Sequence, residues 1–430
     1  MFRFTNLIIF ELTRDCNLNC KYCLMHEKYK HKNEIIDFTL FQKIINRIAE
    51  QRLLNDLADQ TLNLVFHGGE PTLVGKHNFI KFLDYTTKLF NSLNISYNLS
   101  VQTNGTLLDE EYIKIFRQYN VSIGMSYDGI NEKNPLRYSD ETKKKLEDTI
   151  KLSKSMNHKI DTLGVLSKNN HRNIVKDAIL FYNKFGCHTK YSFLEDLKHP
   201  FYSKMELSGR QIYRYAYKPI IKYFIKTGIG LEYHAMNLLQ QSLSDLLCDR
   251  YPVRSRTGCH GLICGEAVSM IAIRPDGSMG YCDRYSKDFK ENYIMHALDY
   301  DFLGLNQLKH AVRLAKIKHH LVVKQGCDSC RATNICENQC LAFYYSKFGE
   351  YGIQSSLVCD QYLPVYDFVK KNLIKIIRKR VGTKIKLCDD FIYDIKPYYR
   401  DLFKNKYNID LKIIDRNLLD IKKIEEIKFV

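Results

Sequence analysis

The sequence predicts an α/β fold, a partial barrel of parallel strands, and three observations support it. Short runs of alternating or β-branched apolar residues predict strands. Charged stretches between them carry apolar residues at three- and four-residue intervals, as amphipathic helices do. The two kinds of segment alternate up to about residue 196, an order typical of parallel strands with right-handed crossovers. A partial, six-unit (β/α) barrel of the TIM type would gather the loops that follow its strands around one site.

The elements follow in chain order. The apolar run at residues 2–10 is the expected first strand. Further strands are expected at residues 62–66, 97–102, 122–126 and 162–166, and the helices between them at 38–51, 78–93, 109–118 and 140–156. Two more helices are expected at residues 211–226, kinked at Pro219, and at 234–247. A hairpin with a Pro-Asp-Gly turn follows at residues 271–277.

These segments predict four regions. Residues 1–196 form the barrel, 197–250 a helical bridge, 251–365 a cysteine-rich module and 366–430 a basic tail. The tail is densest in charge at residues 370–380, where Leu373, Ile374 and Ile377 would line one side of a basic helix able to bind an acidic peptide. A solvated helix face is the plainer alternative.

Composition narrows the class of protein. The 430 residues are 45% hydrophobic and 26% charged, enough for one large or two medium domains. The 14 cysteines are mostly grouped in motifs, and neither a signal peptide nor a run of about twenty apolar residues is found. We therefore expect a reducing, cytoplasmic location and no membrane span. The net charge of +17 is attributed to a soluble surface, and no nucleic-acid partner is expected.

Cysteine spacing points to iron–sulfur chemistry. Cys16, Cys20 and Cys23 follow the first expected strand, and three thiolates would leave one iron of a four-iron cluster open to a chelating ligand. A second group follows the hairpin, with Cys327, Cys330, Cys336 and Cys340 closely spaced. Zinc is the alternative for this second group, although its usual pair of short Cys-X-X-Cys knuckles is absent.

With these motifs the chain resembles radical S-adenosylmethionine (SAM) enzymes that carry a C-terminal SPASM domain, over residues 5 to 365. The resemblance implies that Cys16, Cys20 and Cys23 hold a catalytic [4Fe–4S] cluster, whose open iron binds SAM for cleavage to a 5′-deoxyadenosyl radical. It also implies SAM-contacting residues at the ends of successive strands. These are Tyr22, Gly68, Gly69, Glu70, Gln102, Asn104, Ser126, Asp128 and Arg137, with Glu70 as acceptor for the SAM ammonium and Arg137 as partner of its carboxylate.

By the same resemblance the later cysteines form two auxiliary [4Fe–4S] sites, making three clusters in all. Cys259, Cys264, Cys282 and Cys340 would hold one, and Cys327, Cys330, Cys336 and Cys359 the other. Asp283 directly follows Cys282, as in anaerobic sulfatase maturases, where such an aspartate is proposed to take the substrate proton. A turn aspartate is the alternative for Asp283.

The segments around Glu70, Asn104 and Cys282 resemble those of two branches of this family, both of which act on polypeptides. Maturases of ribosomally made peptides form thioether or carbon–carbon crosslinks or epimerise residues, and the sequence favours this branch, with the basic tail holding a leader peptide. The first alternative is sulfatase-maturase chemistry, which oxidises Cys or Ser to formylglycine. The second is radical modification of a small molecule such as a sugar or antibiotic precursor. A flavodoxin or ferredoxin is the expected electron donor.

Overall fold

The structure is a computed structural model. It describes residues 5–23, 34–129, 136–194, 204–248, 268–283, 294–300, 309–310, 312–313, 316, 327–333, 335–336, 356–380 and 396–407. Cys259, Cys264 and Cys340, three of the predicted auxiliary ligands, lie outside the described residues.

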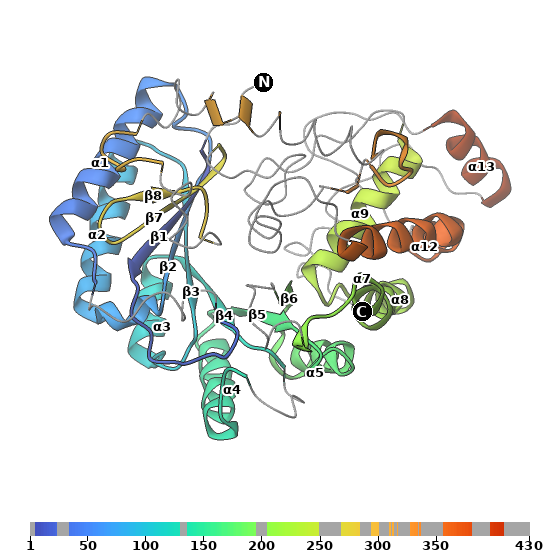
Figure 1. The fold of residues 1–430 in the computed structure, drawn as a ribbon, viewed down its shortest axis with the longest axis horizontal. Helices are drawn as coiled ribbons and strands as arrows, with labels where there is room; N and C mark the ends of the chain where they lie inside the picture. The colour runs from blue at the N-terminus through green and yellow to red at the C-terminus, as the bar shows by residue number, and fades with distance from the viewer. Residues whose placement is uncertain are drawn as a thin grey trace.

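One parallel sheet forms the centre of the fold (Figure 1). Its strands are β1 (Leu7–Thr13), β2 (Leu62–Gly68), β3 (Tyr97–Thr103), β4 (Val121–Ser126), β5 (Ile160–Leu166), β6 (Thr189–Phe193), β7 (Met270–Ile273) and β8 (Met279–Gly280). They lie in the order β6-β5-β4-β3-β2-β1-β7-β8, and every described pair is parallel except β7 with β8. The predicted α/β fold class is confirmed, because each of the first five crossovers in this sheet contains a helix.

Helices cover the outer face of this sheet. They are α1 (Phe38–Leu54), the short 3-10 helix η1 (Pro71–Val74), α2 (Lys76–Ser92), α3 (Glu110–Gln118), α4 (Asp140–Ser155) and α5 (Ile174–Phe185). Side-chain caps begin several of them: Asp37 accepts from Leu40 N at 3.0 Å, and Asp109 accepts from Tyr112 N at 2.9 Å. The apolar faces of α1 to α4 bury a continuous core against the sheet, with Phe41, Phe79 and Phe116 fully buried.

Strand β2 shows how side chains alternate between the two faces of the sheet. Leu62, Leu64 and Phe66 are buried toward the helices, whereas Asn63, Val65 and His67 alternate with them and are half-buried. This period of two places the side chain of His67 on the concave face of the sheet. The polar ends of the strands therefore face the interior of the partial barrel.

The hairpin near residue 275 belongs to this main sheet. Strand β7 pairs in parallel with β1, from Leu7 opposite Met270 to Phe10 opposite Ile273. The turn itself is as predicted, with Gly277 at φ +79° and β8 returning antiparallel. Because β7 pairs in parallel with β1, the turn after β7 lies at the same sheet edge as the loop after β1, and β8 runs back antiparallel from that turn.

A second apolar core lies at the other end of the sheet. It contains α5, β6, α7 (Gly209–Ile212), the π-helix η2 (Tyr213–Tyr217), α8 (Lys218–Thr227), α9 (Tyr233–Leu247) and α12 (Ser356–Arg380). Figure 1 shows α7, α8, α9 and α12 gathered together, with α13 (Pro397–Tyr407) beyond them. The predicted irregularity at Pro219 is present as the transition from π-helix to α8.

Helix α12 corrects one expectation about the basic tail. Leu373 and Ile377, expected on an apolar side open to a peptide, are buried in this core, and only Ile374 is 36% exposed. Helix α13 is attached through Phe403, which is fully buried, and through Lys396, whose Nζ donates to the Asp245 and Leu246 carbonyls at 3.1 Å. The described tail thus contributes its apolar side to the fold. The predicted domain boundaries stay predictions, although α12 runs across the one at residue 365.

Among the described helices, none combines the length and the apolar composition that crossing a bilayer requires.

Strand β6 and helix α9 meet at a buried carboxylate. Glu232 accepts from Tyr191 N at 3.1 Å and from Ala235 N at 2.7 Å, which caps both the sheet edge and the helix. Burial raises the pKa of Glu232 from 4.5 to about 7 despite these bonds. Folding therefore takes up a proton at pH values between those two pKa values.

We predict that this group makes the protein less stable as the pH rises toward 7. From pH 6 to pH 7.5 its contribution to the free energy of unfolding should fall by about 1 kcal/mol. Anaerobic urea unfolding at the two pH values measures the change, and Glu232→Gln should lack it. The same pH dependence in both proteins would contradict the assignment.

Candidate active site

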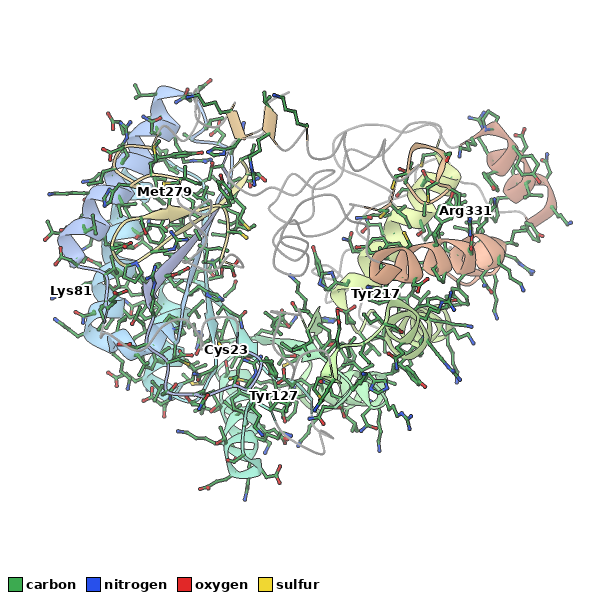
Figure 2. The ribbon with its side chains drawn as sticks, viewed as in Figure 1. Cys23, Lys81, Tyr127, Tyr217, Met279 and Arg331 are labelled. Atoms are coloured by element: carbon green, nitrogen blue, oxygen red, sulfur yellow. The ribbon has the colours of Figure 1, made fainter. Side chains whose placement is uncertain are left out.

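A cavity of about 230 Å³ opens at the carboxyl ends of the strands, where a partial barrel places its site. The predicted residues that line it are Cys16, Cys20, Tyr22, Cys23, Gly68, Gly69, Gln102, Asn104, Ser126, Arg137 and Asp283. Cys23 lies on the inner side of the sheet, away from α1 and α2 (Figure 2). The structure therefore brings together residues that lie as far apart in the sequence as Cys16 and Asp283.

The backbone before Cys16 is held against the segment after β2. Gly69 N donates to Thr13 O at 2.9 Å, and Glu70 N donates to Asp15 O at 2.7 Å. A Cβ on Gly68 would lie 2.0 Å from Thr13 O, and one on Gly69 would lie 2.2 Å from Asp15 O. Only glycine permits this approach, which fixes the start of the cysteine loop.

Glu70 has a different environment from the one expected. Its carboxylate accepts from Thr103 Oγ1 at 2.6 Å, Asn104 N at 2.6 Å and Thr72 N at 3.1 Å, and the residue is 0% exposed. Burial raises the pKa of Glu70, and these hydrogen bonds oppose the rise. The side chain joins the ends of β2 and β3, while the neighbouring Gly68 and Gly69 are the residues of this segment that face the cavity.

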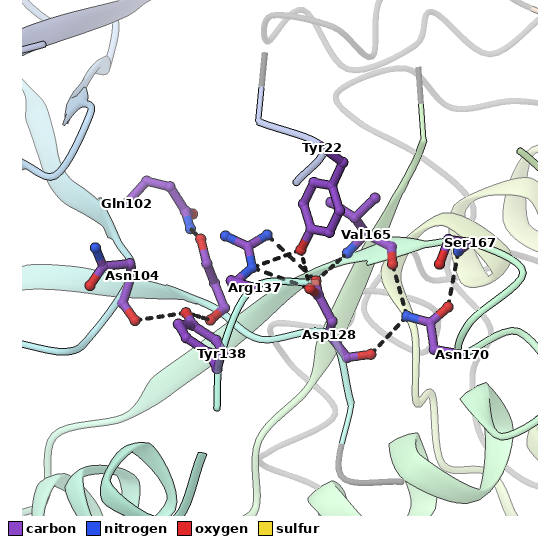
Figure 3. A network of polar contacts seen from close by, with 10 residues as sticks. Tyr22, Gln102, Asn104, Asp128, Arg137, Tyr138, Val165, Ser167 and Asn170 are labelled. Carbon is purple, nitrogen blue, oxygen red and sulfur yellow. Dashed lines mark hydrogen bonds and ion pairs between the residues drawn. The ribbon is translucent and has the colours of Figure 1, made fainter. Parts of the chain in front are cut away.

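Asp128 likewise joins strands. Its carboxylate accepts from the Tyr22 hydroxyl, from Arg137 Nε at 3.3 Å and from Val165 N at 2.8 Å (Figure 3). Asn170 Nδ2 then bonds both Asp128 O and Val165 O, at 2.9 and 2.8 Å. Asp128 is 3% exposed and is absent from the cavity wall. It therefore fastens the cysteine loop, through Tyr22, to the ends of β4 and β5.

Arg137 completes this cluster and also reaches the cavity. Its Nε donates to the Tyr22 hydroxyl at 2.9 Å, and its guanidinium lies 5.3 Å from the centre of the Tyr22 ring. Burial raises the pKa of the Tyr22 hydroxyl well above 10, which keeps it protonated as a donor to Asp128. The guanidinium has five N–H donors, and the contacts to Asp128 and Tyr22 use only Nε and Nη2.

Polar side chains at the ends of β3 and β4 line the same cavity. Gln102 Nε2 donates to Ser126 Oγ at 3.1 Å, so the two predicted residues hold each other in place. Asn104 Nδ2 donates to Asn17 Oδ1 at 2.8 Å and contacts Cys16 Sγ at 3.8 Å. Asn104 thus contacts two residues of the cysteine loop directly.

Asp283 lines the cavity together with the three N-terminal cysteines. Its neighbour Cys282 is 3% exposed and packs against Ile9, Met270 and Ala272 on the concave face. The pairing of β7 with β1 attaches this hairpin to the strand that precedes the cysteines. The sequence indicated that Asp283 lies near the three cysteines only through the resemblance.

His67 is a cavity residue that the sequence prediction omitted. Leu163, Val165, Ser192 and Leu194 also line the wall and were not singled out. The alternating pattern of β2 puts His67 on the same face as Val65, and this pattern could have predicted that His67 lines the cavity.

Comparison with known proteins now assigns the family. Residues 10–179 match the model of the radical SAM superfamily. These residues form a radical SAM domain. The earlier resemblance, including that to sulfatase maturases, is confirmed.

Its relatives are aligned along most of the chain. The cysteine-type anaerobic sulfatase-maturating enzyme of Clostridium novyi is 25% identical over 377 residues, 86% of this chain and 96% of that protein. The radical SAM cyclopropyl synthase TigE of Paramaledivibacter caminithermalis is 25% identical over 372 residues, 82% of this chain and 71% of TigE. The structure of native anSMEcpe with bound AdoMet and Cp18Cys peptide has the same fold, with TM-score 0.66, 21% identity, and coverage of 86% of this chain and 98% of that one.

A radical SAM enzyme uses SAM and a [4Fe–4S] cluster, and the donor set of this cavity fits them. Among the described residues no three His, Cys, Asp or Glu side chains converge as ligands of a single ion. A cubane does not require convergence, because each cysteine binds a different iron. Burial raises the pKa of Cys16 and raises that of Cys20 to about 12, so iron binding must displace these protons.

Part of the second predicted cysteine set is described. Cys327 and Cys330 lie in one turn, where Cys330 N donates to Cys327 O at 3.2 Å. Arg331 forms a two-pronged ion pair with Asp367 of α12, at 2.8 and 2.7 Å, and lies beside that helix in Figure 2. This pair holds the turn near the helix that carries Cys359. The ligand assignment itself stays a prediction.

We predict that Asp128→Ala lowers the free energy of unfolding by about 3–5 kcal/mol, because it leaves the charge of Arg137 without its partner. Iron content per chain after anaerobic reconstitution should fall as well, since Tyr22 loses its acceptor. Asp148→Ala, at an exposed residue paired with Lys151, is the control. Equal stability and iron content in the two variants would contradict the role of Asp128.

Proposed function

We propose that this radical SAM enzyme oxidises a cysteine or serine of a polypeptide to formylglycine, the chemistry of anaerobic sulfatase maturases. Asp283 in the wall of the cysteine cavity is the observation that carries the proposal. Alignment with a cysteine-type sulfatase-maturating enzyme over 96% of its length supports it. This was the alternative to peptide maturation in the sequence analysis, and the relatives favour it.

The bound cofactors would supply a 5′-deoxyadenosyl radical that removes a hydrogen atom from the substrate. We propose that Cys16, Cys20 and Cys23 hold the catalytic cluster. Gly68 and Gly69 would offer backbone groups to the SAM ammonium. Arg137 would offer its remaining guanidinium nitrogen, Nη1, to the SAM carboxylate, because Asp128 and Tyr22 engage only its other two.

Asp283 would act on the substrate. Oxidation of a cysteine side chain to a thioaldehyde removes one hydrogen atom from Cβ, one proton from sulfur and one electron. Asp283 would accept that proton, and the auxiliary cluster predicted at Cys282 would accept the electron. Water then replaces sulfur, giving the aldehyde and hydrogen sulfide. The two auxiliary clusters, a flavodoxin or ferredoxin donor and a cytoplasmic location remain proposals.

Peptide crosslinking is the second candidate. The similar fold of SuiB, whose structure was solved bound to its precursor peptide SuiA, supports a peptide substrate of this kind. Both candidates begin with hydrogen abstraction from a polypeptide, and they differ in the fate of the oxidised residue. A leader-peptide role for residues 366–430 belongs to this candidate and would use exposed residues of α12 such as Lys370 and Lys375.

We predict that the reconstituted enzyme converts a sulfatase-derived peptide containing its target cysteine to an aldehyde. Anaerobic incubation with SAM and reductant, followed by accurate mass measurement, should show replacement of one sulfur and two hydrogens by one oxygen. An aldehyde-reactive hydrazide should label the product.

A peptide with alanine at the target and a Cys16→Ala enzyme are the controls, and neither should give product. Loss of two hydrogens with retention of sulfur would favour crosslinking instead. Release of 5′-deoxyadenosine with an unchanged peptide would contradict both candidates.

A further inference from the structure

Two neighbouring residues of β1 and β2 each have a buried polar atom without a hydrogen-bond partner in the described part of the chain. These atoms are Nδ1 of His67, in the cavity wall, and Oε2 of Glu11. Buried polar groups are nearly always paired, because an unpaired one has lost its hydrogen bonds to water without replacing them. Nδ1 of His67 is therefore open to a hydrogen-bond partner.

The two residues are direct neighbours. Glu11 and His67 are register partners on the parallel strands β1 and β2, about 4.8 Å apart along the direction of the sheet hydrogen bonds. Glu11 is 4% exposed, and Arg14 Nε lies 3.5 Å from its Oε2. Burial raises the pKa of Glu11, while Arg14, Arg274 and His67 oppose that rise. Glu11 therefore places an acceptor behind the imidazole.

The backbone that carries His67 is held in place by the residues that follow it. Gly68 and Gly69, which follow it, are locked against Thr13 and Asp15, as described above. His67 is thus the last residue of β2 whose side chain extends into the cavity that the cysteine loop also lines. Its position relative to the three cysteines is set by the same contacts that set theirs.

Other ionisable groups of the wall are already engaged. Arg137 and Tyr22 are bound to Asp128, and the cysteines are assigned to the cluster. Since Nη1 of Arg137 is assigned to the SAM carboxylate, His67 and Asp283 are the ionisable groups of the described wall that remain for the substrate. If Nδ1, which has no hydrogen-bond partner in the structure, donated to Glu11, the outer nitrogen Nε2 would be held as an acceptor in a fixed tautomer.

We propose that His67 contacts the target residue of the polypeptide through Nε2 and that Glu11 positions the imidazole from behind through Nδ1. This inference rests on the proposed function and names the group that recognises its substrate. With Nδ1 protonated and directed toward Glu11, Nε2 accepts a hydrogen bond from the substrate thiol or hydroxyl. The contact orients Cβ for hydrogen abstraction, and Asp283 keeps its role as proton acceptor.

Amide substitutions test which nitrogen matters. Glutamine can place an amide group near the position of Nε2, and asparagine near that of Nδ1. We predict that His67→Ala and His67→Asn lower the yield of aldehyde per 5′-deoxyadenosine released by about tenfold or more, whereas His67→Gln recovers most of it. Glu11→Gln should lower the yield to an intermediate value. His77→Ala, at an exposed histidine of α2, should match the wild type.

Iron content and SAM affinity of each variant separate this role from a structural one. Normal iron content and SAM affinity with a low aldehyde yield support substrate positioning. An unchanged yield in His67→Ala, a better yield in His67→Asn than in His67→Gln, or a loss of SAM affinity in His67→Ala would overturn the inference. If the wild type releases 5′-deoxyadenosine but forms no aldehyde, the proposed function fails, and this inference fails with it.

Discussion

The parallel pairing of β1 with both β2 and β7 is the constraint on which the site depends. It makes the loop after β1, with the three cysteines, the neighbour of Gly68 and Gly69 on one side and of the hairpin that leads to Asp283 on the other. The carboxyl ends of the parallel strands form one edge of the sheet, and the hairpin that packs on β1 adds Asp283, more than 250 positions from Cys16, to the same cavity. A break in either pairing would separate the cluster loop from a component of the proposed chemistry.

The hydrogen-bond partners of the polar residues in the site distinguish those that hold the structure from those that can bind ligands. Glu70 and Asp128 are almost fully buried and have their carboxylates saturated by donors, so they hold strand ends and the cysteine loop in place. His67 lines the cavity, and Arg137 has donors beyond those that Asp128 and Tyr22 use, so these residues can meet ligands. Glu70 and Asp128 thus preorganise the site, because Glu70 holds the end of the strand that carries His67 and Asp128 binds Arg137.

Local sequence patterns predicted the strands β2 to β5 and the cysteine loop, because alternation and spacing are local properties. They did not predict that β7 joins β1, since that pairing depends on packing between distant segments. The resemblance identified the segment around Glu70 and Asp128, but which of their atoms face the cavity depends on partners such as Thr103 and Val165. The apolar side of α12 looked available for a peptide because its contacts with α8 and α9 are not encoded in its own spacing.

The most direct test of the account follows a hydrogen from substrate to cofactor. A target peptide whose cysteine carries deuterium at Cβ should transfer one deuterium to 5′-deoxyadenosine as the aldehyde forms, which mass spectrometry of both products detects. Aldehyde formation with 5′-deoxyadenosine free of deuterium would contradict hydrogen abstraction at Cβ in this cavity.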